Sequence, residues 1–274
     1  MRSDNQARLS AAQRGQWRKP AFIEGKWRRV ALSAGVLAYL ALALGSVEVN
    51  WARVAEGAGR GLNFLAAFAH PDFVSRQSDI LAGLLESLTM TLTSTVIGVL
   101  LAIPVGLGAA RNIAPLPVYV LCRAIIAVSR TFQEIIIAIL FVVMFGFGPL
   151  AGMLTLAFAT VGFMAKLLAE DIEDLDARQV EAVRSTGAGW WQVMNHAVQP
   201  QVMPRLIGLS MYRLDINFRE SSVIGIVGAG GIGATLNTSL SRYEYSTSAA
   251  ILLIIIAIVL ASEYASSHIR RFTQ

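Results

Sequence analysis

Four charged side chains inside an apolar segment, residues 206–227, have the greatest capacity for chemistry in this chain. They are Arg213, Asp215, Arg219 and Glu220. An unpaired charge at the centre of a bilayer costs at least about 2.5–3.5 kcal/mol, so each of these groups needs a partner or a function. Arg219 lies four residues after Asp215 and can pair with it on one helix face.

Arg213 needs a partner on another helix or an anion, and Glu86 and Glu134 are the candidate partners. Two interpretations stay open for this segment. In the first, Arg213 lies near the cytoplasmic end of a span, where it is solvated and structural. In the second, Arg213, Asn217 and Arg219 line a polar translocation path. A path for an anionic cargo would tolerate cationic side chains in its lining.

A glycine-rich run, residues 228–233, reads G-A-G-G-I-G and matches the pattern G-x-G-x-x-G. A dinucleotide site with this pattern needs a strand before it and an acidic residue about 20 residues later, and Glu244 comes too early. The run therefore favours a bend, where helices pack closely or a gate flexes, at Gly228, Gly230 and Gly231. The sequence contains no G-x-x-x-x-G-K-[ST] motif, so ATP would have to bind to a separate chain.

Metal chemistry is not predicted. Cys122 is the only cysteine, which excludes an intrachain disulfide and a cysteine-based metal site. The three histidines, His70, His196 and His268, are far apart and have no ligand spacing.

The most polar interior stretch is residues 181–204, EAVRSTGAGWWQVMNHAVQPQVMP. A helix that starts near Asp171 is expected to stop at Gly187, because glycine permits the bend that other residues resist. A second short helix, residues 190–198, is expected to end at Pro200. The pattern predicts a helix–turn–helix elbow that projects from a membrane.

The composition indicates a polytopic membrane protein built as one membrane domain. Of the 274 residues, 55% are hydrophobic and 15% are charged, whereas soluble domains carry about 25% charged residues. Mean hydropathy is +0.56. A helix needs roughly 18–20 residues to cross a bilayer, and six apolar segments are close to or above this length. They are residues 30–47, 81–107, 116–147, 150–168, 206–227 and 249–265.

Residues 30–47 read as a retained anchor rather than a cleaved signal peptide, because the apolar run exceeds the usual length of about 7–15 residues. Residues 53–68 are expected to form an amphipathic helix on the outer surface. Residues 116–147 are too long for one straight crossing. In this segment Arg130 and Glu134 are predicted to form a structural i,i+4 pair.

The placement of basic residues predicts the orientation, because basic loops stay in the cytoplasm. With both termini inside, 17 of the 23 Lys and Arg residues lie in inside segments and 4 lie outside. This arrangement places the elbow in the cytoplasm. It also accounts for the pI near 9.7 without any nucleic acid.

The elbow resembles the EAA loop of ABC-importer permeases, which couples the membrane domain to an ATPase. The positions that match this pattern are Glu181, Ala182, Gly187 and Pro200. Residues 212–233, which include the run from Tyr212 to Arg219 and the glycine run, are similar to the corresponding segment of phosphonate-importer permeases. Asp215 and Phe218 depart from that family's pattern.

The resemblance implies an all-α membrane protein with six transmembrane helices, cytoplasmic termini and the type I ABC-importer permease fold with a methionine-permease-like core. Composition, hydropathy and charge placement predict a cytoplasmic tail 1–29, a first transmembrane helix 30–47 and an extracytoplasmic segment 48–80. The resemblance begins near residue 81 and implies a permease core 81–268 with a cytoplasmic coupling loop 170–204. The implied ATPase-coupling residues are Glu181, Ala182, Arg184, Gly187 and Pro200. The implied path or gate residues are Arg213, Asn217, Arg219, Gly228, Gly230 and Gly231.

The function that the resemblance implies is ATP-driven import of a phosphonate or a related phosphorus oxyanion across the bacterial inner membrane. The chain would be no enzyme and would carry no cofactor, with ATP and magnesium on two partner ATPase subunits. Further expected partners are a second permease copy or paralogue, an extracytoplasmic substrate-binding protein and membrane lipid. The alternatives are an importer of phosphite, phosphate or an amino acid, a passive channel, and an NAD-binding membrane oxidoreductase.

Overall fold

A computed structural model describes residues 25–46 and 50–273, with side chains described through Tyr264. Most of the predicted tail, 1–29, therefore lies outside the described residues. The described part divides into two units, residues 1–59 and 60–274. All of its regular secondary structure is helical, and no strand occurs among the described residues.

The first unit contains the helix α2 (Lys26–Ser46) and the beginning of α3 (Trp51–Ala67). No residue of α2 is buried within the protein. Its 21 residues rise about 30 Å at 1.5 Å per residue, which matches the hydrocarbon thickness of a bilayer. This exposed apolar helix fits the predicted first span, whose last residue, Val47, lies outside the described residues.

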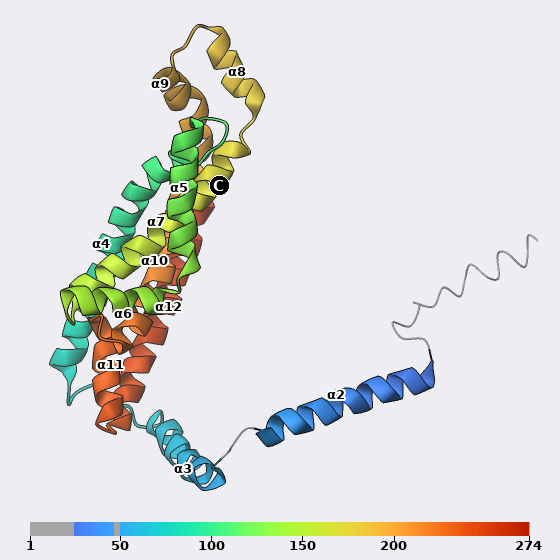
Figure 1. The fold of residues 1–274 in the computed structure, drawn as a ribbon. Helices are drawn as coiled ribbons and strands as arrows, with labels where there is room; N and C mark the ends of the chain where they lie inside the picture. Colours follow the sequence, from blue (N-terminus) through green and yellow to red (C-terminus); the bar gives the residue numbers. More distant parts are fainter. Residues whose placement is uncertain (1–24, 47–49, 274) are drawn as a thin grey trace, which may run out of the picture. The chain divides into compact units, whose positions relative to one another are not determined.

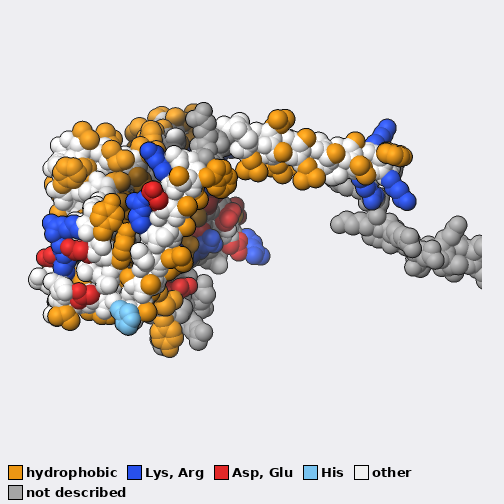
Figure 2. Space-filling model, turned by 90° about the horizontal axis from the view of Figure 1, so that it is seen from below, with side chains coloured by type: hydrophobic (Ala, Val, Ile, Leu, Met, Phe, Trp, Pro, Cys, Tyr) orange, Lys and Arg blue, Asp and Glu red, His pale blue; other side chains and the backbone are white. Residues whose placement is uncertain are grey.

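The second unit is a helical bundle (Figure 1). Its elements after α3 are α4 (Gln77–Gly108), α5 (Leu116–Thr131), α6 (Glu134–Phe145), α7 (Pro149–Glu173), α8 (Ala177–Ser185), α9 (Trp190–Val193), the π-helix η1 (Met194–Val198), α10 (Gln199–Ile226), α11 (Gly231–Ser241) and α12 (Tyr245–Thr273). Hydrophobic side chains spread over the face of the protein seen in Figure 2, as expected for a surface in contact with lipid or partner subunits.

The centre of the bundle is the packing of α4 against α7 through small residues. A Cβ at Gly98 would collide with Thr160, and one at Gly106 would collide with Leu168. Ala102 and Ala165 are completely buried in the same cluster. Small residues let helix backbones approach closely, which is how helices gain packing energy in a membrane.

Among the residues that the structure describes, five stretches are long and apolar enough to cross a membrane, and the number rises to six if a bent pair counts as one span. They are Lys26–Ser46, Gln77–Gly108, Pro149–Glu173, Trp190–Ser241 and Tyr245–Tyr264, with Leu116–Thr131 and Glu134–Phe145 as the bent pair. The prediction of several spans is confirmed. The 206–227 span is longer than predicted, because α9, η1, α10 and α11 form one long apolar stretch.

The bent pair is α5 and α6, which meet at 94°. Phe132 and Gln133 separate them with extended backbone, at ψ 138° and 144°. The expectation that residues 116–147 do not make one straight crossing is confirmed. The predicted Arg130–Glu134 pair is wrong: no salt bridge joins them in the described part of the chain, since i,i+4 neighbours meet only within a continuous helix.

The helix boundaries in the elbow also differ from the expectation. The predicted helix from Asp171 is divided, because α7 continues to Glu173 and α8 begins only at Ala177. Pro200 does not end the second helix, because it lies in the first turn of α10. Helical backbone also precedes this proline, because the π-helix η1 ends at Val198 and α10 begins at Gln199. The backbone hydrogen bond that Pro200 cannot donate therefore falls where the π-helix gives way to the α-helix.

The glycine run forms the tight connection between α10 and α11. Gly228 and Gly230 have φ of +93° and +81°, a left-handed conformation that favours glycine. A Cβ at Gly233 would collide with the carbonyl oxygen of Ser222, and one at Gly225 would lie 2.5 Å from the carbonyl oxygen of Gly230. The predicted bend with close helix packing is confirmed.

We expect Gly233→Ala to destabilise the protein by about 1–3 kcal/mol, because the added methyl group must displace backbone atoms of α10. Thermal unfolding of the purified protein in detergent measures the effect as a lower Tm. Gly208→Ala is the matched control, since Gly208 lies in α10 with open space where its Cβ would be. Equal melting temperatures of the two variants would contradict the packing described here.

Candidate functional site

The residues that the sequence singled out fall into two regions of the second unit. One is the 170–204 loop, which comprises the end of α7, then α8, α9, η1 and the first turn of α10, and which lies at one end of the bundle (Figure 1). The other is a set of buried polar groups along α10.

The short helix α8 is fixed at both ends by local contacts. The carboxylate of Asp176 accepts a hydrogen bond from the Arg178 backbone N–H at 3.0 Å, which makes Asp176 the N-cap. The Arg178 guanidinium also donates to Asp176, at 3.1 and 2.9 Å. After α8, Gly187 has φ of +81° and turns the chain toward α9. The turn predicted at Gly187 is confirmed.

Hydrogen bonds from Arg178 lower the pKa of Asp176 below its usual value of 3.8. A carboxyl whose pKa is lower in the folded state stabilises that state above its unfolded pKa. The stabilisation of α8 by the Asp176 carboxylate is therefore complete above about pH 4. It is lost as the pH falls through the lowered pKa of Asp176.

The tip of the loop presents charged groups to solvent. Glu181, Ala182, Arg184 and Gly187 are all exposed. Glu181 and Arg184 line a cavity of about 260 Å³ at the junction of α8 with the rest of the bundle. Within the residues that the structure describes, neither side chain takes part in a salt bridge. Pro200 is exposed as well but lies apart from this cavity, in α10.

Ion pairs anchor the base of the loop to the bundle. Arg123 of α5 contacts Glu173 at 2.8 Å, and the same carboxylate oxygen accepts the Arg111 backbone N–H at 2.8 Å. Arg205 of α10 contacts Asp171 at 3.0 Å. The sequence analysis did not predict these partners, which are 34 to 62 positions apart in the sequence.

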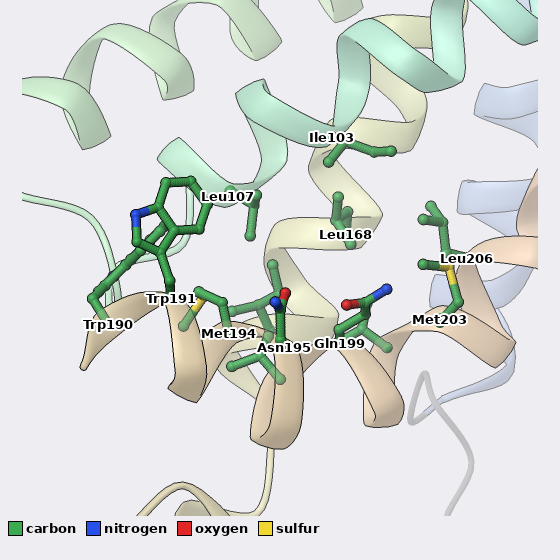
Figure 3. A pocket seen from close by; sticks show the side chains of 13 residues that line it. Ile103, Leu107, Leu168, Trp190, Trp191, Met194, Asn195, Gln199, Met203 and Leu206 are labelled. Carbon is green, nitrogen blue, oxygen red and sulfur yellow. The ribbon is translucent and has the colours of Figure 1, made fainter. Parts of the chain in front are cut away.

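An apolar cavity of about 320 Å³ lies beside the anchors, between α4, α7 and the second half of the loop. Figure 3 shows its lining, with Trp190 and Trp191 at one end, Leu206 and Met203 at the other, and Ile103 opposite the loop. The two tryptophan rings meet edge to face, with centroids 4.6 Å apart. The adjacent tryptophans were the available sequence signal for this feature.

Arg213 is buried, with 4% of its side chain exposed. Its Nε donates to Thr160 Oγ1 at 3.1 Å, and its guanidinium lies 5.4 Å from the centroid of the Phe163 ring. Its Nη2 lies 3.8 Å from Oε1 of Glu134. Of the two predicted partners, Glu134 is therefore confirmed, whereas Glu86 lies beside Gly230. The solvated position that one interpretation gave Arg213 is wrong.

Asn217 is completely buried and joins three helices. Its amide nitrogen donates to Thr95 Oγ1 of α4 at 2.8 Å and to Thr160 Oγ1 of α7 at 2.9 Å. Sequence reasoning missed the two threonines, because a threonine in an apolar helix is common and gives no distinctive signal.

The predicted pair of Asp215 and Arg219 is confirmed at 3.3 Å. Asp215 is buried and also accepts a hydrogen bond from Ser262 of α12, whereas the Arg219 side chain is 56% exposed. The structure thus brings Arg213 and Asn217 together around Thr160 and leaves Arg219 on the surface. Gly228, Gly230 and Gly231 lie together in the α10–α11 connection.

Other kinds of site lack support in the described residues. No group of three His, Cys, Asp or Glu side chains could hold a metal ion in the part of the chain that was described. The glycine run follows a helix, α10, rather than the strand that a dinucleotide site requires.

Comparison with known proteins gives a consistent result. Residues 78–272 match the family described as "Binding-protein-dependent transport system inner membrane component". The phosphate-import permease protein PhnE of Mycolicibacterium smegmatis is 42% identical over 201 residues, which cover 73% of this chain and 38% of the relative. The phosphite transport system permease protein PtxC of Stutzerimonas stutzeri is 43% identical over 202 residues, 73% of each chain.

The fold is similar to that of a solved chain of the MetNI methionine ABC transporter in an inward-facing conformation. The TM-score is 0.65 and the sequence identity is 23%, with 73% of this chain and 100% of that chain covered. At this identity the likeness concerns the fold alone. It confirms the predicted methionine-permease-like core.

We expect Asp176→Ala to increase local opening of α8, because the helix loses its N-cap and the contact to Arg178. Hydrogen exchange of the amides of residues 177–185, measured in detergent at pH 7, should become faster by about fivefold. Asp174→Ala is the control, since Asp174 lies two residues earlier and does not cap α8. In the unmodified protein, the protection factors of the α8 amides, which are the ratios of intrinsic to observed exchange rates, should fall below pH 4. Unchanged exchange in Asp176→Ala would contradict the assigned cap.

Proposed function

This chain belongs to the family of binding-protein-dependent transport system inner membrane components, and we propose that it is the membrane-spanning permease subunit of an ATP-driven importer. The family match covers residues 78–272, and the family resemblance predicted from the sequence motifs is confirmed. Five or six helices able to cross a membrane agree with this role. The chain spans only 38% of the length of the first relative, so activity, cargo and partners are part of the proposal.

The observation that carries the proposal is the exposed, charged tip of the 170–204 loop. Glu181 and Arg184 extend from a helix that is capped by Asp176 and ended by Gly187. Exposed charged side chains on a capped helix, without a salt bridge of their own among the described residues, suit an interface with a partner of complementary charge. We infer that this partner is the ATPase subunit and that Ala182, Gly187 and Pro200 belong to the same coupling surface.

The anchors of the loop support a mechanical role. A force on α8 reaches α7 through its end at Glu173, which Arg123 holds at 2.8 Å. It reaches α10 through η1, because the chain is helical from Trp190 to Ile226. In this mechanism, closure of two ATPase chains displaces the loop, and α7 and α10 carry the displacement to the helices around the path. ATP and magnesium bind to the ATPase chains.

The proposed cargo is a phosphonate or a related phosphorus oxyanion. The support is the identity of 42–43% to permeases named for phosphate import and phosphite transport. Because those two names differ, they support the class of cargo rather than one compound. An amino acid remains the alternative cargo. The methionine transporter shares only 23% identity, so its similarity supports the fold alone.

The proposed assembly contains two ATP-binding subunits, a second permease copy or paralogue, and an extracytoplasmic substrate-binding protein. The chain would be a multi-pass protein of the bacterial inner membrane. In this assembly the exposed apolar helices face lipid or the second permease. A passive channel is the competing function, and it predicts flux of the cargo without ATP or an ATPase.

We expect a phosphorus oxyanion to stimulate ATP hydrolysis by the reconstituted importer. The chain is placed in proteoliposomes with its ATPase and binding protein, and methylphosphonate, phosphite, phosphate and methionine are added one at a time. Stimulation by one of the phosphorus compounds supports the proposed class and identifies the cargo. Stimulation by methionine alone would overturn the cargo but keep the architecture, and flux without ATP would indicate a channel.

We expect Glu181→Arg to reduce ATP-driven uptake by about tenfold or more, because charges of like sign at an interface cost several kcal/mol. Gln179→Arg is the matched control, since it adds the same charge to α8 at another exposed position. Equal uptake in the two variants would contradict the assigned role of Glu181.

Gly187 allows a second comparison. Gly187→Val should also reduce uptake, because a β-branched residue strains the backbone at φ +81° by about 1–2 kcal/mol or more. Gly187→Asn should retain more activity, since asparagine tolerates this conformation. Membrane insertion, measured by the amount of protein in the membrane fraction, should be normal in both. Full uptake in the valine variant would contradict a coupling role for this turn.

A further inference from the structure

A second, polar cavity lies where α5 and α6 meet. Its volume is about 330 Å³, within the range of about 300–1,000 Å³ that is usual for small-molecule sites. It is lined by Ser129, Arg130, Thr131, Phe132, Gln133, Glu134, Ala159, Phe163 and Arg213. Two of the charged residues in this lining are basic and one is acidic.

The guanidinium of Arg213 is held at this cavity with one nitrogen unused. Its Nε donates a hydrogen bond to the Thr160 hydroxyl, and the guanidinium group lies over the Phe163 ring, so the side chain is fixed in position. Nη2 is buried and has no hydrogen-bond partner among the described residues. A buried donor without a partner costs free energy, and such a group calls for an explanation.

The contact with Glu134 does not satisfy that nitrogen. The distance of 3.8 Å from Nη2 to Oε1 is too long for a hydrogen bond. Other ion pairs of this chain are shorter, at 2.8 Å for Arg123–Glu173 and 3.0 Å for Arg205–Asp171. The Glu134 carboxylate therefore lies in front of the guanidinium without being bonded to it.

The start of α6 adds a second feature that favours an anion. Gln133 and Glu134, its N-cap and first residue, line the cavity, and no side chain caps this 12-residue helix. Backbone N–H groups at a free helix N-terminus attract anions. Ser129 and Thr131 already donate their hydroxyl protons to the carbonyl oxygens of Phe158 and Ala127, so they are not donors for a ligand.

We propose that Arg213, Arg130 and the N-terminus of α6 form a binding site for a phosphorus oxyanion, and that the Glu134 carboxylate occupies this site in competition with the anion. A tetrahedral oxyanion replaces Glu134 in front of Arg213 and accepts hydrogen bonds from Nη2 and from the first turn of α6. Because the carboxylate can return, the anion is released rather than trapped. This inference rests on the proposed function, since it places the cargo within the permease.

Direct binding tests the site separately from transport. The permease–ATPase complex, without binding protein, is purified in detergent and titrated with radiolabelled inorganic phosphate and methylphosphonate. We expect Arg213→Gln to weaken binding by about tenfold or more, and Arg213→Lys to restore part of it. Glu134→Gln should tighten binding several-fold, because the competing charge is removed.

Glu220→Gln is the matched control for Glu134. Glu220 interacts electrostatically with both Glu134 and Arg213 but does not line the cavity, so its change should alter binding by less than Glu134→Gln does. The Tm of each variant separates loss of binding from loss of folding. Unchanged binding in a folded Arg213→Gln, or weaker binding in Glu134→Gln, would overturn the site.

Two further outcomes identify the source of the anion. Lipid extraction from the purified complex shows whether a phospholipid headgroup occupies the cavity. Arg213→Gln could lose a bound phospholipid while its phosphate binding and uptake stay normal. In that case the site binds a lipid headgroup, and its assignment to the cargo is overturned. Uptake of phosphorus compounds by the wild-type importer tests the proposed function. Uptake that Arg213→Gln does not change would overturn the site and leave the function standing.

Discussion

The bundle depends on one buried amide. Asn217 of α10 donates to Thr95 of α4 and to Thr160 of α7, so a single side chain sets the relative positions of three helices. In a membrane these bonds matter because helices have no hydrophobic driving force to associate, and buried polar groups must find partners within the protein. The Thr160 hydroxyl oxygen also accepts a hydrogen bond from the Arg213 Nε. The packing of the bundle and the position of its buried cation therefore rest on the same hydroxyl.

The two ends of the bundle are built differently from this centre. At the α10–α11 end, glycines bring backbone into contact with backbone, and Ile232 donates its N–H to the Ser87 hydroxyl at 2.9 Å. At the opposite end, ion pairs hold the base of the 170–204 loop, while its tip has charges without a salt bridge within the described residues. Close backbone packing resists displacement, whereas an exposed, capped helix on charged anchors offers a surface to a partner. The asymmetry suits a bundle that is acted on from one end.

How far the sequence could predict this structure depends on the range of each interaction. Spans, the excess length of residues 116–147 over one straight crossing, the turn at Gly187 and the Asp215–Arg219 pair follow from local patterns, and the structure confirms them. The Arg130–Glu134 pair was wrong because two extended residues interrupt a helix that the sequence makes look continuous. The threonines that bind Asn217 and the arginines that anchor the loop lie far away in the sequence, so no spacing rule could reveal them. Pro200 did not mark the end of a helix, because helical backbone continues through it from η1 into α10.

The continuity of α10 connects the two regions that carry the proposals. Helical backbone leads from Trp190 in the loop to Arg213, and Arg213 lies 14 residues after Gln199, which is about 21 Å along the axis. Glu134 lies on α6, which crosses the bundle at a steep angle to α5 (Figure 1). A displacement of the loop that moves α10 along its axis therefore changes the separation of Arg213 from Glu134, because the two groups lie on different helices. At 3.8 Å the pair is already beyond hydrogen-bond distance, so a small movement decides whether the carboxylate or an external anion faces the guanidinium. Coupling at the loop and occupancy of the polar cavity would in this way share one mechanical element.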